Sequence, residues 1–204
     1  MSILVINCFH WLGFHIISHL LETGEAVDGL HIPSRDSREH LADFVGRNSQ
    51  FQLLEQAPKQ EYENIIIIGE YPSIDQLKAK RLIMVNGETR SNIHSLITVH
   101  ANILFGEWMP MDLQGIYIGE KYVSFESDEF LREAIYVEDF VQILMTILQS
   151  SHLADHIYIR PREVKSLVGI PEEQIINLRT QTPIKEKIRS LQKHFREFRQ
   201  WYEA

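Results

Sequence analysis

The sequence contains a single cysteine, Cys8, among its 204 residues. One cysteine can form neither a disulfide within the chain nor a metal cage made of cysteines alone. No apolar run approaches the roughly 20 residues that cross a bilayer, since the longest aliphatic run is Ile65 to Ile68. Met1 to Val5 also lacks the basic region and apolar core of a secretory leader. These absences predict a cytoplasmic protein without a membrane partner.

Positive charge is scarce as well. The chain has 20 Lys and Arg residues against 28 Asp and Glu residues, a formal net charge of -8. Nucleic acids and anionic lipids attract basic surfaces, so the composition predicts no non-specific binding to either and no nucleic-acid partner. With 44% hydrophobic residues and only 10 glycines and 7 prolines, the composition is that of an ordinary globular protein.

The first half of the chain alternates short apolar runs with segments of helical spacing. β-branched runs predict strands buried on both faces, and the helix expected at Leu12 to Thr23 is followed by Gly24 as a stop signal. A shorter helix is expected around Leu41, Phe44 and Val45, beginning at Asp36 or Ser37, and a short turn of helix at most at "IDQLKA". The expected strands are Ile3 to Ile6, Ala26 to Ile32, Phe51 to Leu54, Asn64 to Glu70, Arg81 to Gly87, and one within Leu96 to Gly106.

The pattern changes after Gly106. "GIYIGEKYVSF" predicts a strand or hairpin, Val137 to Leu148 an apolar helix, "DHIYIRP" a short strand, and Pro183 to Tyr202 an amphipathic helix. Alternating strands and helices indicate parallel βαβ units. The predicted fold is therefore α/β, with a Rossmann-like doubly wound parallel sheet in residues 1–110 and a reduced C-terminal lobe in residues 111–204, which together form one structural unit.

Four stretches, in order along the chain, resemble the NAD-dependent epimerase/dehydratase family, the extended short-chain dehydrogenase/reductases. They are "ILVI…LG…HLLETGEAVDGLHI", "ITVHANILFGEWMP", "REAIYVEDFVQILMTIL" and the closing "TPIKEKIRSLQKHFREFRQWYEA". The third is the most specific, because it holds the Arg132, the Ile-Tyr-Val run and the Asp139 that lead into a helix in that family. The resemblance implies a nucleotide-binding fold and a cleft for NAD or NADP.

The loop that would cradle the cofactor departs from the family. Such a loop uses glycines for a tight turn, for close approach to the pyrophosphate and for helix packing. Here Asn7 and His10 stand at the first two glycine positions, followed by Trp11 and Leu12, and Gly13 alone is retained. The side chain of His10 is expected to fill space that a pyrophosphate needs, while Gly13 serves packing.

The end of the second strand departs too. An Asp or Glu there binds the ribose of NAD, but this chain has His31, with Arg35 and Arg38 shortly after. Arg35 is either a partner for the phosphate of NADP or part of a solvated face. The cleft implied by the resemblance consists of Asn7, His10, Trp11, Leu12, Gly13, His31, Arg35, Gly69, Asn86 and Asn102.

The resemblance also implies a catalytic Tyr and Lys, four residues apart on a helix between the fifth and sixth strands. Only "ETRSNIHS" lies there, without Tyr or Lys, so Thr89 and Ser91 would have no partner for proton relay. Tyr117 and Lys121 have the right spacing, but they lie in a strand-like stretch with Gly119 between them and are interpreted as a coincidence. The sequence therefore assigns no catalytic residue.

Other chemistry has weaker signals. His15 and His19 share a helix face at i,i+4 spacing, but a zinc site needs a third ligand nearby, so no metal is assigned. Cys8 beside His10 is either a buried small hydrophobe or a reactive thiol. The apolar stripe of the last helix packs inward or serves a partner or a homodimer.

Two hypotheses follow. The first, which we favour, is a catalytically degenerate epimerase-like protein that binds a protein partner or a small ligand, with no cofactor. The alternative is an NAD(P)-dependent oxidoreductase or sugar-nucleotide epimerase with an altered cofactor loop. The absence of the Tyr/Lys helix favours the first hypothesis, in which the protein is not an enzyme.

Overall fold

The computed structural model describes residues 2–33, 38–89, 93, 95–150, 154–162, 169–178 and 182–202. The chain divides into two compact units, which are described separately. The first consists of residues 1–100 and 146–157, and the second of residues 101–145 and 158–204. Each unit is made of two segments, whereas the expected division used a single boundary at residue 110.

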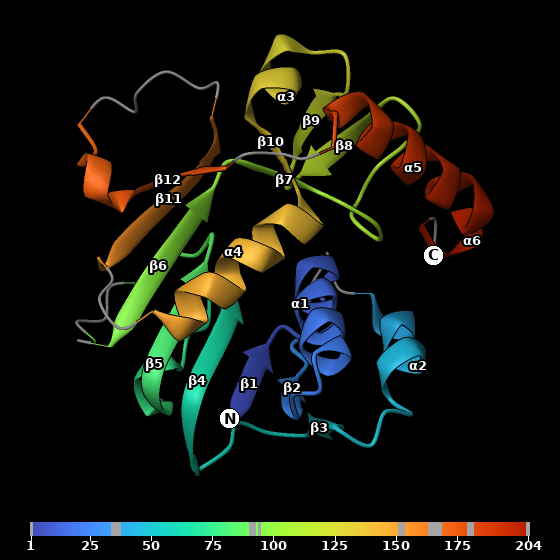
Figure 1. The fold of residues 1–204 in the computed structure, drawn as a ribbon. Helices are drawn as coiled ribbons and strands as arrows, with labels where there is room; N and C mark the ends of the chain where they lie inside the picture. The colour runs from blue at the N-terminus through green and yellow to red at the C-terminus, as the bar shows by residue number, and fades with distance from the viewer. Residues whose placement is uncertain are drawn as a thin grey trace. The chain divides into compact units, whose positions relative to one another are not determined.

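Within the described residues, eight strands form the central sheet (Figure 1). They are β1 (Ile3–Ile6), β2 (Val27–Leu30), β3 (Phe51–Leu54), β4 (Glu61–Ile68), β5 (Lys78–Val85), β6 (Leu96–Ala101), β11 (His156–Pro161) and β12 (Ile175–Leu178). Their spatial order is β12-β11-β6-β5-β4-β1-β2-β3. The first six strands thus follow the order 3-2-1-4-5-6 of a doubly wound nucleotide-binding sheet. The predicted α/β fold class is confirmed.

The β-branched runs form the centre of this sheet because both of its faces are covered. All four residues of β1 are buried, and β1 pairs in parallel with β2 on one side and β4 on the other. Helix α1 (Trp11–Glu22) packs against β1 and β2 (Figure 1). It buries Ile16, Ile17 and Leu20, and Gly24 follows it with a φ of 84°. The helical spacing of apolar residues and the glycine after them therefore correctly predicted this helix and its end.

Two connections of the sheet are short loops. Residues 69–77 join β4 to β5 with only the 3₁₀ turn η2 (Ile74–Gln76), and residues 86–95 join β5 to β6 with no helix in their described part. Both are shorter than the crossover of about a dozen residues that usually joins parallel strands through a helix. Apolar side chains of these loops instead pack on the sheet face formed by Leu4, Ile6, Leu30, Ile65, Ile67, Leu82 and Met84; the loop residues are Tyr71, Ile74, Leu77 and Ile93.

Within the first unit, Arg81 of β5 binds the end of helix α4. Its guanidinium donates hydrogen bonds to the carbonyl oxygens of Ile147 (3.1 Å), Leu148 (2.6 Å) and Ser150 (2.6 Å). These carbonyls belong to the last turn of α4 (Val137–Gln149) and the residue that follows it. A cation at a helix C-terminus satisfies carbonyls that have no partner within the helix and interacts favourably with the helix dipole.

The second unit holds smaller elements. β7 (Ile103–Phe105) pairs in parallel with β10 (Ala134–Tyr136), and β8 (Gly115–Ile118) forms an antiparallel hairpin with β9 (Lys121–Ser124). The helices are α3 (Asp128–Glu133), most of α4, α5 (Ile184–Glu197) and α6 (Arg199–Tyr202). The remaining short elements are η1 (Glu39–Leu41) and α2 (Ala42–Val45) in the first unit and η3 (Glu172–Gln174) in the second.

The helix predicted over Pro183 to Tyr202 is interrupted at Phe198, which has non-helical backbone angles. Beyond this interruption, Tyr202 lies against α5 and against the loop that follows β7. Its hydroxyl accepts a hydrogen bond from the Trp108 amide at 2.8 Å and lies 2.8 Å from His194 Nδ1. The expected N-caps Asp36 and Ser37 lie outside the described residues. None of the described helices combines the length and apolar character of a bilayer span.

Candidate functional site

The turn after β1 uses an asparagine where a phosphate-binding loop has a glycine. Asn7 has a φ of 63°, a left-handed conformation that Asn tolerates better than most residues. Its side-chain amide donates to the carbonyl oxygen of Ile68 at 2.5 Å, and its own carbonyl accepts from the His10 amide at 2.9 Å. The side chain therefore ties the carboxyl end of β1 to that of β4.

Close packing between the first turn of α1 and the preceding loop requires a glycine at position 13. A Cβ atom built on it would lie 2.4 Å from the carbonyl oxygen of Asn7 and 3.2 Å from that of Cys8. No side chain fits at that separation, so the first turn of α1 can approach the loop only with glycine here. This is the packing function expected of the third glycine in a nucleotide-binding loop.

His10 caps helix α1. Its backbone is extended, with φ -64° and ψ 141°, and its ring nitrogen Nδ1 accepts a hydrogen bond from the Leu12 amide at 3.2 Å. The N–H groups at a helix N-terminus are the groups that would otherwise bind an anion. The imidazole thus takes one of these donors. Trp11 and Leu12 are buried, so they contribute to the core.

His31 follows the end of β2 and packs beside an aromatic ring. Its ring centroid lies 5.2 Å from that of Phe9, and its Nε2 lies 3.9 Å from a carboxylate oxygen of Glu39. Neither ring nitrogen has a hydrogen-bond partner among the described residues. Arg35, the predicted partner for an NADP phosphate, lies outside them.

The ends of β4 and β5 carry the next two predicted residues. Gly69 has a φ of 72° and Asn86 a φ of 50°. The Gly69 amide donates to Val85 O, and a Cβ on Gly87 would lie 2.2 Å from Gly69 O. Asn7, Gly69 and Asn86 therefore lie at the carboxyl edge of adjoining strands, where open α/β sheets bind ligands.

Asn102 belongs to the second unit, where its side chain donates to a carboxylate oxygen of Glu133 at 3.2 Å. The structure thus brings most of the predicted cleft together around the ends of β1, β4 and β5. A cofactor-binding role for these residues stays a prediction.

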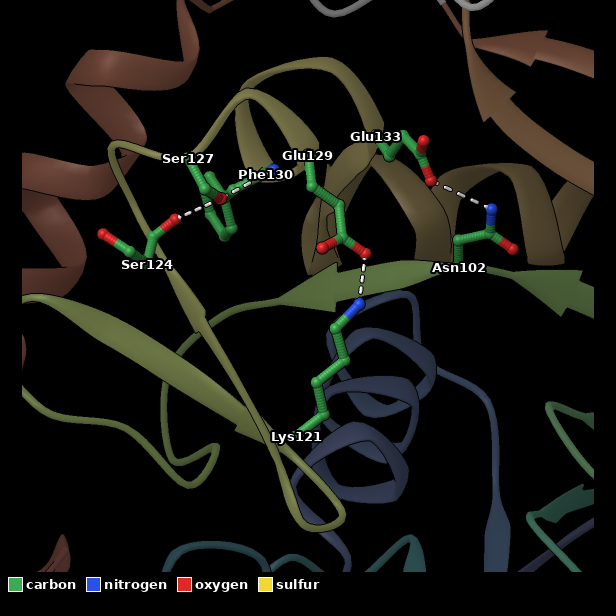
Figure 2. A network of polar contacts seen from close by, with 7 residues as sticks. All are labelled: Asn102, Lys121, Ser124, Ser127, Glu129, Phe130 and Glu133. Carbon is green, nitrogen blue, oxygen red and sulfur yellow. Dashed lines mark hydrogen bonds and ion pairs between the residues drawn. The ribbon is translucent and has the colours of Figure 1, made fainter.

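The Tyr/Lys pair of hydride-transfer enzymes has no counterpart between β5 and β6, because residues 86–95 contain neither residue type. Tyr117 and Lys121 do not replace it. Tyr117 lies on β8 facing Tyr122 of β9, and Figure 2 shows Lys121 ion-paired with Glu129 of α3. The two residues therefore lie on a hairpin rather than on one helix face, and their lack of a catalytic role stays a prediction.

Figure 2 also shows how this part of the second unit is fixed. Ser127 caps α3 by accepting from the Phe130 amide at 3.1 Å, and its hydroxyl donates to Ser124 O at 2.7 Å. The acidic residues Glu129 and Glu133 are engaged by Lys121 and Asn102. The network is a structural support for the hairpin and α3.

The second unit contains a pocket of about 440 Å³ that the sequence analysis did not assign. Three of its lining side chains are cationic, Arg132, Arg162 and Lys187, and one, Asp139, is acidic. The others are mostly apolar: Phe105, Leu131, Ala134, Tyr136, Pro161, Leu178, Thr182, Pro183 and Ile184. The motif that carried the family resemblance supplies three of these residues, Arg132, Tyr136 and Asp139. That motif could therefore have pointed to the pocket.

Electrostatic interactions organise one wall of this pocket. Lys187 lies 2.9 Å from a carboxylate oxygen of Glu138, and its ammonium lies 4.0 Å from the ring centroid of Tyr136, a cation–π contact. Tyr136 donates its hydroxyl hydrogen to Glu107 at 2.6 Å. Burial and the Glu107 carboxylate raise the pKa of Tyr136, so it is a phenol at neutral pH.

Asp139 supplies the acidic side chain of the pocket. Burial raises the pKa of its carboxyl group, as does the nearby Glu138, while Lys187 acts in the opposite direction. A carboxyl group with a raised pKa in a pocket is a frequent feature of functional sites. The pocket thus holds a phenol, a carboxyl group and an ammonium group from Tyr136, Asp139 and Lys187.

Cys8 and His15 both have packed surroundings. Cys8 is buried, and burial raises its pKa to about 12, so the thiol is a small hydrophobe. His15 packs edge-on against Trp11 and Phe14. Within the described part of the chain, no three His, Cys, Asp or Glu side chains gather in a way that could hold a metal.

The architecture is a Rossmann-like α/β fold, and solved structures with a similar fold are known. A dTDP-glucose 4,6-dehydratase from Streptomyces venezuelae with NAD is 11% identical, with a TM-score of 0.67 over 100% of this chain and 99% of that one. A UDP-glucose 4-epimerase from Thermotoga maritima with UDP-glucose is 14% identical, with a TM-score of 0.60 over 97% and 99%.

A yeast methylglyoxal/isovaleraldehyde reductase in complex with NADPH is 14% identical, with a TM-score of 0.58 over 98% and 100%. No protein-family model and no curated protein sequence matches the chain. The chain is thus similar in structure to the NAD-dependent epimerases, dehydratases and reductases. This confirms, for the fold, the resemblance predicted from the sequence.

Proposed function

We propose that this protein is a catalytically degenerate relative of the enzymes whose fold it shares, and that it binds a small anionic ligand in the pocket of its second unit. The observation that carries the proposal is the lining of that pocket. Three cationic side chains, Arg132, Arg162 and Lys187, face a cavity with a single carboxyl group.

This concentration of positive charge runs against the net charge of the chain, which is -8. Guanidinium groups recognise phosphate and carboxylate groups through paired hydrogen bonds, which a lysine alone does not provide. Lys187 is held in place by Glu138 and the ring of Tyr136, so its contribution is preorganised. Asp139 is suited to a hydroxyl group of the same ligand. A phosphorylated polyol or sugar fits this set.

Three features support binding without Tyr/Lys hydride transfer. Residues 86–95 contain no Tyr or Lys. The raised pKa of Tyr136 and its hydrogen bond to Glu107 make that phenol unsuitable as a base at neutral pH. His10 occupies the N-terminus of α1 with its own ring. Together they favour a protein that has no nicotinamide cofactor.

The alternative function is an NAD(P)-dependent oxidoreductase or epimerase with an altered loop. It is favoured by the left-handed residues Asn7, Gly69 and Asn86 at the strand ends, and by structural neighbours that contain NAD or NADPH. Under this alternative, binding of NAD or NADP would stabilise the protein, and a reduced cofactor would be consumed with a carbonyl or sugar-nucleotide substrate.

Thermal unfolding with defined probes tests the proposal. We expect UDP or inorganic pyrophosphate at a hundred times its dissociation constant to stabilise the protein by about 2.7 kcal/mol. For a chain of this size this corresponds to a rise in Tm of roughly 5–10 °C. Millimolar NAD and NADP are expected to give no shift.

Matched variants locate the site. Arg132→Gln and Arg162→Gln should abolish the shift, whereas Arg196→Gln, which removes an exposed arginine of α5 away from the pocket lining, should retain it. If neither phosphate probe raises the Tm, or if both pocket variants respond like the unmodified protein, the pocket proposal is wrong. Turnover of NADH or NADPH would overturn the assignment as a non-catalytic protein.

A further inference from the structure

Two histidines from neighbouring strands of the first unit face each other. His100 lies near the end of β6 and His156 begins β11, and the Thr98 amide bonds Asp155 O between the same two strands. His100 Nε2 lies 3.2 Å from His156 Nδ1. The ring centroids are 5.5 Å apart and the ring planes differ by only 16°. The two nitrogen atoms therefore point toward one another.

We propose that His100 and His156 form a binding site for a divalent transition-metal ion of the zinc class. Zinc–imidazole bonds of 2.0–2.1 Å at a tetrahedral angle place two ligand nitrogens about 3.3 Å apart. The observed separation of 3.2 Å is close to that edge length. Neutral imidazoles are ligands for zinc, nickel and copper, and these two supply half of a tetrahedral set.

The ion replaces the proton that the two nitrogens share in the metal-free protein. With the rings almost coplanar, the lone pairs point along the N–N line, and a metal at bonding distance lies off that line. Each ring then turns by roughly 40° if both bonds are to be about 2.05 Å long. His156 is exposed, so it has room to turn. When the metal binds, the proton leaves the shared position and the ring that donated it takes up a proton at its other nitrogen, so both rings ligate as neutral imidazoles.

The charges around the pair act in both directions: burial of the His100 ring and the neighbouring His156 act against positive charge there, whereas the carboxylate of Glu88, in the loop after β5, contributes negative charge. No third His, Cys, Asp or Glu of the described residues completes the cluster, so water fills the other positions. The site is therefore open and of modest affinity. A bound ion links β6 to β11, two strands that are distant in sequence.

The site differs from the one that spacing alone indicates. His15 and His19 occupy one face of α1, but the ring of His15 is packed against Trp11 and Phe14. The pair on β6 and β11 is separated by 56 residues, so no local motif marks it. This makes His19 a matched control, because its removal also deletes one imidazole from the chain.

The experiment is a titration of the full chain with ZnCl₂ at pH 7.5, followed by calorimetry and by the ¹⁵N resonances of the imidazole rings. One zinc ion should bind and shift the signals of His100 Nε2 and His156 Nδ1. His100→Gln and His156→Gln should each weaken binding on the order of tenfold or more, since even loss of a group that merely orients a ligand costs 10–100-fold. His19→Gln should bind zinc within about twofold of the unmodified protein, a change smaller than that seen on loss of an orienting group.

Circular dichroism without metal shows that each variant is folded before its affinity is compared. If His156→Gln is folded and binds zinc as tightly as the unmodified protein, the site is elsewhere and the proposal is wrong. The same conclusion follows if zinc leaves the ring signals of both histidines unshifted. Should His100→Gln fail to fold, the exposed His156 and the ring resonances still decide the question.

Discussion

Gly13→Ala is the most direct test of how α1 meets the strand-one turn. The added Cβ would lie 2.4 Å from the carbonyl oxygen of Asn7, a backbone atom that cannot rotate away. Two further backbone atoms would lie at 3.2 and 3.3 Å. Either α1 or the loop must therefore move by a substantial fraction of an ångström, and the hydrogen bond of Asn7 to Ile68 lies in the part that must shift.

The expected cost is a balance of two effects. Overpacking of this kind costs about 3 kcal/mol at the upper end of the usual range, whereas alanine is favoured over glycine inside a helix by about 1 kcal/mol. The net loss in the free energy of unfolding is about 2 kcal/mol. For a chain of about 200 residues this lowers Tm by roughly 4–8 °C.

Urea unfolding and calorimetry of the variant measure this loss. Ser18→Ala, in the middle of the same helix, is the matched control and should remain within about 0.5 kcal/mol of the unmodified protein. A Gly13→Ala variant as stable as the unmodified protein, or more stable, would refute the reasoning. It would mean that α1 begins farther from Asn7 than the structure places it.

Three further outcomes follow from other parts of the molecule. Arg81→Met should lower the free energy of unfolding by about 2–4 kcal/mol, because it leaves the carbonyls at the end of α4 unpaired. In urea unfolding, the stability of Arg81→Lys should lie between that of the unmodified protein and that of Arg81→Met. Cys8, with a pKa of about 12, should react with a thiol reagent at pH 8 only after unfolding; rapid labelling of the native protein would contradict its burial. The carboxyl pKa of Asp139 is raised in the folded protein, so its ionised form destabilises the fold above that pKa and this penalty disappears as pH falls toward the unfolded value. Asp139→Asn should therefore be more stable than the unmodified protein at pH 7, with the difference shrinking toward pH 4; a constant difference would count against the burial of this group.

Local patterns predict the core of the first unit. The β-branched runs at β1 and β4 became strands, and the spacing in α1 placed Ile16, Ile17 and Leu20 inward. Such signals succeed because strand and helix periodicity are set by neighbours in sequence. Among the described residues between β5 and β6 there is no helix, and the sequence indicated this because so few residues separate the two apolar runs.

The pocket of the second unit could not be predicted in this way. Arg132, Arg162 and Lys187 come from three distant segments, and each alone resembles an ordinary surface cation. Trp108 illustrates the same limit for the backbone. Its φ of 68° is unfavourable for a large side chain, and the hydrogen bond from its amide to Tyr202, 94 residues later, helps to hold it there. Tertiary contacts of this range leave no periodic trace in the sequence.

The pairing of Arg81 with the end of α4 has a consequence for synthesis on the ribosome. The acceptor carbonyls belong to Ile147, Leu148 and Ser150, and the first unit also includes residues up to 157. The amino-terminal sheet therefore emerges long before the segment that completes it. A nascent chain grows at roughly 5–20 residues per second, so β5 waits several seconds with its arginine unpaired. Completion of the first unit is a late event, because residues 146–157 are translated only after residues 101–145 of the second unit.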